Sequence, residues 1–133
     1  MKMKLLFIAL LFILAGCETT LTQAEIDSAK YGHPISQNFA ASEALNFLLV
    51  NIKEIKSPIC QWKPLYMGAL KDGAIYGGKW FFGYILDGEV KEKNNLGLYG
   101  ESIPYKFVFY DGKIVAVFSN KFLGQKPYFG RIY

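Results

Sequence analysis

The stretch that decides the fold is Tyr105-Lys106-Phe107-Val108-Phe109-Tyr110-Asp111-Gly112-Lys113-Ile114-Val115-Ala116-Val117-Phe118. Two alternating apolar segments flank Asp111-Gly112, a dipeptide typical of a two-residue hairpin turn because both residues tolerate a positive φ. Such a turn pairs Tyr110 with Lys113 and Phe109 with Ile114. Counting outward by twos predicts a core face on one side of the hairpin. That face consists of Tyr105, Phe107, Phe109, Ile114, Ala116 and Phe118.

The opposite face of the predicted hairpin is only half polar. Its members are Lys106, Val108, Tyr110, Lys113, Val115 and Val117. Contiguous exposed apolar side chains mark either a covered surface or an interaction site. We therefore take Val108, Tyr110 and Val115 as candidate binding residues.

Upstream of the hairpin, the sequence predicts one long helix and two further strands. Between Ala40 and Lys56, apolar residues recur at spacings of one, three and four, as on one face of a helix. The face consists of Ala44, Leu45, Leu48, Leu49, Ile52 and Ile55, widened by Phe47 and Val50. Ser57-Pro58 is expected to end the helix, because proline disfavours the α conformation of its predecessor. Residues 60–67 and 79–90 alternate as strands do.

These elements predict an α+β fold, with one main amphipathic helix packed on a three- to four-stranded antiparallel meander sheet. Thr22-Gln23-Ala24-Glu25 fits a capping box, which predicts a short helix before the domain. We expect a signal peptide over 1–16, a tether with this short helix over 17–39, the α+β domain over 40–119, and a tail over 120–133 that packs on the domain.

The N-terminus has the features of an export signal. Met1-Lys2-Met3-Lys4 is basic, and Leu5 to Ala15 is an apolar run of 11 residues. A helix needs about 20 residues to cross a bilayer, so this run has the length of a signal-peptide core instead. Leu14-Ala15-Gly16-Cys17 resembles the lipobox of bacterial lipoproteins. The alternative is an ordinary thiol at Cys17 after a conventional signal peptide.

The lipobox resemblance implies that Cys17 carries acyl chains and anchors the protein to a membrane without crossing it. Glu18 stands where a retention signal for the inner membrane usually has Asp, so the resemblance favours the periplasmic face of the outer membrane. Cys60 is then the only free thiol, which excludes an intramolecular disulfide. We read Cys60 as a small, partly buried apolar residue.

A second resemblance concerns residues 40–118. Gly83 to Val90, Lys93 to Gly100 and Pro104-Tyr105 are similar to segments of a group of small proteobacterial lipoproteins. The sequence departs from that group at Lys56-Ser57-Pro58, where an acid more often precedes the proline, and at Leu86 in place of cysteine. No biochemical activity is assigned to the group, so the resemblance implies none here.

The composition argues against several classes of chemistry. His33 is the only histidine, which disfavours a metal site with several imidazoles and a buried Ser-His-Asp triad. Without its first 16 residues the chain has a surplus of two positive charges, too few to predict nucleic-acid binding. We therefore predict no catalytic residues, no metal, no cofactor and no small-molecule substrate.

The connection between residues 91 and 100 is longer than a hairpin needs. It combines polar donors with an aromatic ring, and loops on a rigid sheet are common binding sites. Its candidate binding residues are Lys91, Lys93, Asn94, Asn95 and Tyr99. The alternative is a twisted turn with a purely structural role.

Together these observations predict a non-enzymatic envelope lipoprotein that faces the periplasm and binds another envelope component, expected to be a protein. The alternative is an inhibitor or exclusion factor that acts against phage, a conjugation apparatus or a lytic enzyme. A third reading is an enzyme such as a peptidoglycan hydrolase, for which no catalytic constellation is visible in the sequence.

Overall fold

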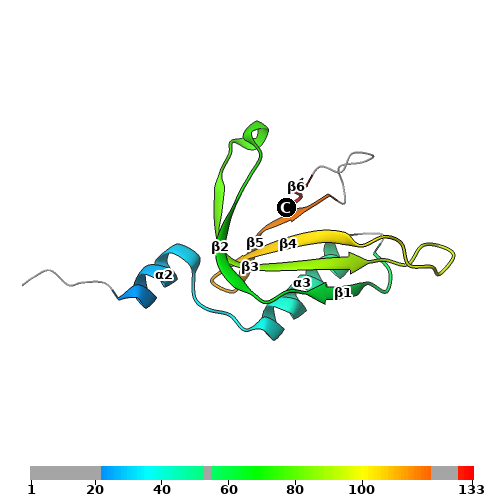
Figure 1. Cartoon of the computed structure of the whole chain (residues 1–133), viewed down its shortest axis with the longest axis horizontal. Helices are drawn as coiled ribbons and strands as arrows, with labels where there is room; N and C mark the ends of the chain where they lie inside the picture. The colour runs from blue at the N-terminus through cyan, green and yellow to red at the C-terminus, as the bar shows by residue number, and fades with distance from the viewer. Residues whose placement is uncertain (1–21, 53–54, 121–128) are drawn as a thin grey trace, which may run out of the picture.

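The computed structural model describes residues 22–52, 55–120 and 129–133. The chain belongs to the α+β class, as expected (Figure 1). The helices are α2 (Gln23–Tyr31), α3 (Gln37–Asn51) and the 3-10 turn η1 (Ala74–Tyr76); the strands are β1 (Ile59–Trp62), β2 (Tyr66–Lys71), β3 (Trp80–Lys91), β4 (Ile103–Tyr110), β5 (Lys113–Ser119) and β6 (Gly130–Arg131). The predicted signal peptide and the lipidation of Cys17 lie outside the described residues.

The strands form one antiparallel sheet in the order β1-β3-β4-β5-β6, and β2 also pairs with β3. This sheet has six strands, more than the three to four predicted. The predicted strand over 60–67 is in fact two, separated at Pro64, whose backbone has no N–H to donate to a ladder. The sixth strand, β6, pairs with β5 through Ser119 and Gly130.

Strand β3 pairs with different strands along its length. Its residues 84–90 pair with β4, whereas residues 80–83 pair only with β2. We call β2, η1 and residues 80–83 the arm, which projects away from the rest of the sheet in Figure 1. Gly83 stands at the base of the arm, where an added Cβ would collide with the carbonyl oxygen of Phe109. Only glycine permits this close approach of the two backbones.

Helix α2 begins where the sequence predicts. The capping box is formed: the Thr22 hydroxyl accepts from the Glu25 amide at 3.2 Å, and a Glu25 carboxylate oxygen accepts from the Thr22 amide at 3.0 Å. Gly32 ends the helix with φ of 79°, a conformation that favours glycine. The Ala29 carbonyl accepts from the Tyr110 hydroxyl at 2.9 Å, so the helix contacts the β4–β5 hairpin.

Helix α3 differs from the prediction at both ends. It starts earlier, because the Ser36 side chain accepts from the Phe39 amide and caps the N-terminus. It stops at Asn51, well before Ser57-Pro58, since Ile52 adopts an extended backbone. The predicted apolar face is also partly wrong: Leu45 and Leu49 are exposed. The buried residues of the helix are Ala40, Ala44, Phe47 and Leu48. None of the helices among the described residues is long and apolar enough to cross a membrane.

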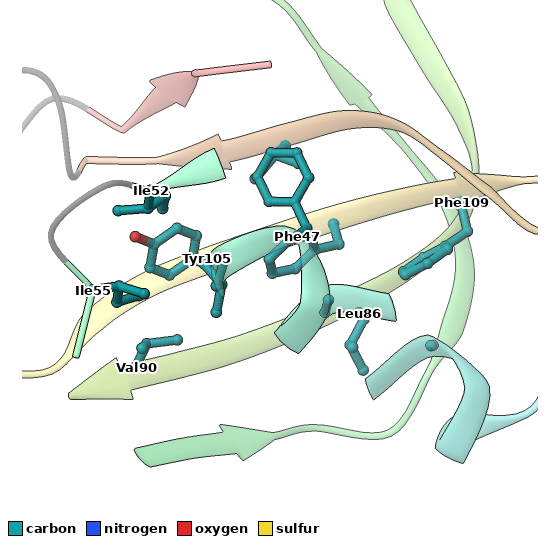
Figure 2. Close-up of a cluster of buried hydrophobic side chains, with 12 residues drawn as sticks. Phe47, Ile52, Ile55, Leu86, Val90, Tyr105 and Phe109 are labelled. Atoms are coloured by element: carbon teal, nitrogen blue, oxygen red, sulfur yellow. The ribbon is translucent and has the colours of Figure 1, made fainter. Parts of the chain in front are cut away.

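The main core brings α3 and the sheet together. The Phe47 ring meets the Phe107 ring edge-on, with centroids 5.8 Å apart. Figure 2 shows Tyr105 beside Ile52 and Ile55, the two residues that follow α3 and enter the same core. The cluster comprises Ala40, Ala44, Phe47, Leu48, Ile52, Ile55, Leu86, Val90, Tyr105, Phe107, Phe109 and Val117.

The predicted pairing at the hairpin turn is confirmed, and so is the core face of β4, where Tyr105, Phe107 and Phe109 are buried; the predicted faces are wrong only on β5 beyond Val115. Tyr110 pairs with Lys113 and Phe109 with Ile114; Val108 then pairs with Ala116, so Val115 is an extra residue. Such a bulge shifts the alternation of β5 by one position, so residues 116–118 exchange faces. Val117 therefore joins Phe107 in the main core. The opposite face buries Ile85, Val108, Ala116 and Phe118, packed against Leu70 and Phe81 of the arm.

Candidate functional site

A cleft of about 590 Å³ lies between the arm and the β5–β6 edge of the sheet. Phe118 of β5, at the edge of the second core cluster, forms part of its apolar wall. The residues that line it are Leu70, Lys71, Asp72, Gly73, Tyr76, Lys106, Phe118, Phe129, Gly130 and Arg131. Sites for small ligands and peptide side chains are typically mostly apolar hollows with a few polar groups.

One ion pair closes the end of this cleft. Asp72, 3% exposed, accepts from Arg131 Nε at 2.8 Å and from the Gly73 amide at 2.9 Å. The Arg131 guanidinium also lies 5.3 Å from the centroid of the Phe81 ring. The bond to Asp72 uses the Nε–H, and a guanidinium has four further N–H donors. Arg131 thus joins β6 to the arm and brings a positive charge to the cleft.

Lys106, which lines the cleft, belongs to a second ion pair. Lys106 Nζ is 3.0 Å from Asp87 Oδ2, and the Tyr66 hydroxyl donates to the same carboxylate at 3.4 Å. Burial alone would lower the pKa of Lys106, but the hydrogen bond and the attraction of Asp87 raise it above its ordinary value. Lys106 is therefore positively charged throughout the physiological range.

The predicted loop over 91–100 is held by contacts among its own residues and by hydrogen bonds to Lys56 and Ser57. Lys93 and Tyr99 form an isolated bridge, and the Lys93 ammonium lies 5.5 Å from the Tyr99 ring. The Asn94 side chain accepts from the amides of Leu96 and Leu98, at 2.9 and 3.0 Å. The Tyr99 hydroxyl donates to the Ser57 carbonyl at 3.1 Å. Lys91 and Asn95 are exposed. Lys93, Asn94 and Tyr99 therefore stabilise the loop.

The other three predicted site residues lie elsewhere. Val108 lies on the predicted face of β4 but is fully buried in the second core cluster, so its expected accessibility is wrong; Leu70 and Phe81 of the arm pack against this cluster. Val115 is exposed, and Tyr110 is partly buried with its hydroxyl on Ala29. The Tyr110 hairpin and the 91–100 loop adjoin opposite ends of β4, so the eight predicted binding residues do not form one site.

The cleft itself was missed by the sequence analysis. Asp72 and Arg131 stand 59 residues apart, and no local pattern links them. The one available signal was the apolar character of the tail, whose Phe129 lines the cleft.

Three further findings concern metal-ligating and nucleophilic side chains among the described residues. They contain no group of three or more His, Cys, Asp or Glu side chains that could hold a metal ion. Burial raises the pKa of the Cys60 thiol, which keeps it protonated and weakly nucleophilic at neutral pH. His33 is exposed, and its backbone amide donates to Asp111 at 2.9 Å.

Comparisons with protein-family models, with curated proteins and with solved structures each give no match.

Proposed function

We propose that this chain is a lipid-anchored protein of the bacterial cell envelope, without enzymatic activity, that binds another envelope protein. The lipobox-like segment Leu14 to Cys17 supports the anchor, and Glu18 favours the periplasmic face of the outer membrane. In this proposal, α3 packed on the antiparallel meander of β3, β4 and β5 is the rigid scaffold, and the residues from Cys17 to the start of α3 are the tether.

The cleft carries the binding part of the proposal. Its apolar lining includes Tyr76 and Phe129, which are 68% and 43% exposed. Large aromatic side chains at a hollow are the usual anchors of protein interfaces. Arg131 and Lys106 add positive charge beside them. The partner segment that fits is therefore apolar, with a carboxylate placed to meet the Arg131 guanidinium.

The lipid anchor is tested by labelling cells with radioactive palmitate. The wild-type chain is expected to take up label and to stay with the membrane fraction. The Cys17→Ser variant, which lacks the thiol that receives the lipid, is expected to take up none. Equal labelling of both chains, or of neither, contradicts the anchor.

The cleft is tested with a photo-crosslinking amino acid placed at Tyr76 in intact cells. One envelope protein is expected to be captured from this position, and the Phe129→Asp variant is expected to lose the product. The matched control places the crosslinker at Leu96, an exposed residue of the 91–100 loop. The same products from both positions, or none from Tyr76, contradict binding through the cleft.

The 91–100 loop favours a second candidate function, an inhibitor or exclusion factor. Leu96 and Leu98 are 83% and 62% exposed, on a turn that Asn94 holds in place. A pre-ordered apolar tip loses little entropy when it enters a foreign protein. Deletion of the protein should then sensitise cells to one attack by phage, mating or lysozyme, and Leu96→Asp should reproduce it. Unchanged sensitivity to all three contradicts this function.

A further inference from the structure

The arm has a second face, turned away from the cleft. Cross-strand pairing places Lys71 opposite Trp80, Ala69 opposite Phe82 and Met67 opposite Tyr84. Alternate residues of the same strands, Leu70 and Phe81, pack against the second core cluster on the cleft side. We call Met67, Lys71, Trp80 and Phe82 the outer face; Lys71, at the end of β2, also lines the cleft. Its three apolar side chains are 45%, 52% and 36% exposed, respectively.

Two residues of α2 extend this outer face. The Tyr31 ring lies 6.2 Å from the Phe82 ring, and the Lys30 ammonium lies 5.3 Å from the same ring. On the arm itself, the Lys71 ammonium lies 5.8 Å from the Trp80 ring. The outer face therefore combines exposed aromatic rings with ammonium groups held beside them.

Negative charge is largely kept away from the outer face. Asp72 is the only acidic residue between Tyr66 and Tyr84, and it is buried on the cleft side with Arg131. The two carboxylates of α2 bond within their own helix, Glu25 with Thr22 and Asp27 with Gln23. Tryptophan, tyrosine and lysine together are the residues enriched where proteins meet lipid headgroups.

The position of α2 brings this face close to the proposed anchor, so the inference rests on the proposed function. Thr22 follows Cys17 by five residues, which can span at most about 18 Å. The nine residues of α2 add about 14 Å before Tyr31, which contacts Phe82. A bilayer that holds acyl chains on Cys17 is therefore within reach of the outer face.

We propose that the outer face docks on the headgroup region of the bilayer in which Cys17 is anchored. Trp80, Phe82 and Met67 enter the interface, and Lys30 and Lys71 meet the lipid phosphates. The docked arm presents its other side, the cleft, away from the bilayer toward the periplasm. The lipid and the outer face thus act as two membrane contacts that orient one binding site.

The two tryptophans of the chain allow a direct test. Trp62→Phe leaves Trp80 as the only indole, on the outer face; Trp80→Phe leaves Trp62, whose ring centroid lies 5.8 Å from that of Phe107. Each full-length lipidated variant is placed in phosphatidylethanolamine–phosphatidylglycerol vesicles in which part of the lipid carries bromine near the headgroup. Bromine quenches only nearby indoles, so we expect Trp80 emission to fall at least twofold and Trp62 emission to stay constant.

The outcomes separate this inference from the proposed function. The mass of the N-terminal peptide is measured first: an unmodified Cys17 overturns the proposed anchor and this inference with it. A lipidated chain whose Trp80 is quenched no more than Trp62 overturns the inference alone. If Trp80 emission instead changes with protein concentration and not with brominated lipid, a second copy of the chain, and not the bilayer, covers the outer face. That result also overturns the inference. Lys71→Gln should weaken the quenching of Trp80, and the difference from the wild-type chain should shrink as phosphatidylglycerol is withdrawn. This dependence distinguishes phosphate contacts from insertion alone.

Discussion

The two halves of β3 have the same alternation of apolar side chains and very different surroundings. Leu86 and Val90 in the second half are completely buried, whereas Trp80 and Phe82 in the first half are 52% and 36% exposed. The second half lies in the core formed with α3, and the first half leaves the sheet as part of the arm. Alternation thus identifies the faces of a strand without identifying what covers them.

The largest effect expected from this comparison is in the core. Phe107→Ala removes a ring that meets Phe47, Trp62 and Tyr105, so we expect a loss of about 3–5 kcal/mol in the free energy of unfolding. Trp80→Ala on the outer face should cost less than about 1 kcal/mol. Urea unfolding of the two variants measures both values. Equal losses contradict the distinction between the two halves of β3.

The base of the arm gives the next effect. Gly83→Ala places a Cβ against the Phe109 carbonyl oxygen, and because backbone cannot move aside cheaply, we expect a loss of about 2 kcal/mol or more. Gly100→Ala is the matched control, since its added Cβ meets nothing within 4 Å. Thermal unfolding compares the two. A Gly83 variant as stable as the control contradicts the close approach of β3 and β4.

A smaller effect is expected where β6 meets the arm. Arg131→Gln removes the guanidinium from the buried carboxylate of Asp72, and the loss of a charged hydrogen bond should cost about 2 kcal/mol. Lys113→Gln, at an exposed position on β5, serves as the control and should change stability by less than about 0.5 kcal/mol. Urea unfolding measures the stability of both variants. An Arg131 variant as stable as the control contradicts the contact between β6 and Asp72.

The smallest effect concerns the Cys60 thiol. Burial raises its pKa above the ordinary 9.0, which lowers the thiolate fraction at pH 8. Alkylation of the lipidated protein by iodoacetamide should therefore be at least twofold slower in the folded state than in urea, and should accelerate as the pH rises above 9. Equal rates in the two states contradict the protected position of Cys60.

The sequence predicts the local features of this fold well. The Asp111-Gly112 turn, its two nearest strand pairs, the capping box at Thr22 and the long strand β3 all depend on neighbouring residues, and all are present. The bulge at Val115 has no such local signal. It reverses the face assignments of Ala116, Val117 and Phe118. Val108 was taken for a surface residue for another reason: the arm, whose Leu70 and Phe81 pack over that face, is a long-range feature.

The long-range features are the ones that the sequence could not supply. The cleft needs Asp72 and Arg131 to meet across 59 residues, and the outer face needs the end of α2 to reach Phe82. Helix α3 ends at Asn51, and Ile52 and Ile55 reach the core from beyond the helix, which the proline rule does not foresee. The candidate site was therefore visible only in the folded chain.

We propose that the first half of β3 faces the bilayer, whereas the second half packs in the core of the protein. Hydrogen exchange of the lipidated protein, compared between detergent and vesicles, tests this most directly. We expect exchange in vesicles to slow at least tenfold for the amides of residues 66–71 and 80–83, and to stay unchanged for residues 105–118. Unchanged exchange in the arm, or new protection confined to residues 91–100, would contradict the account.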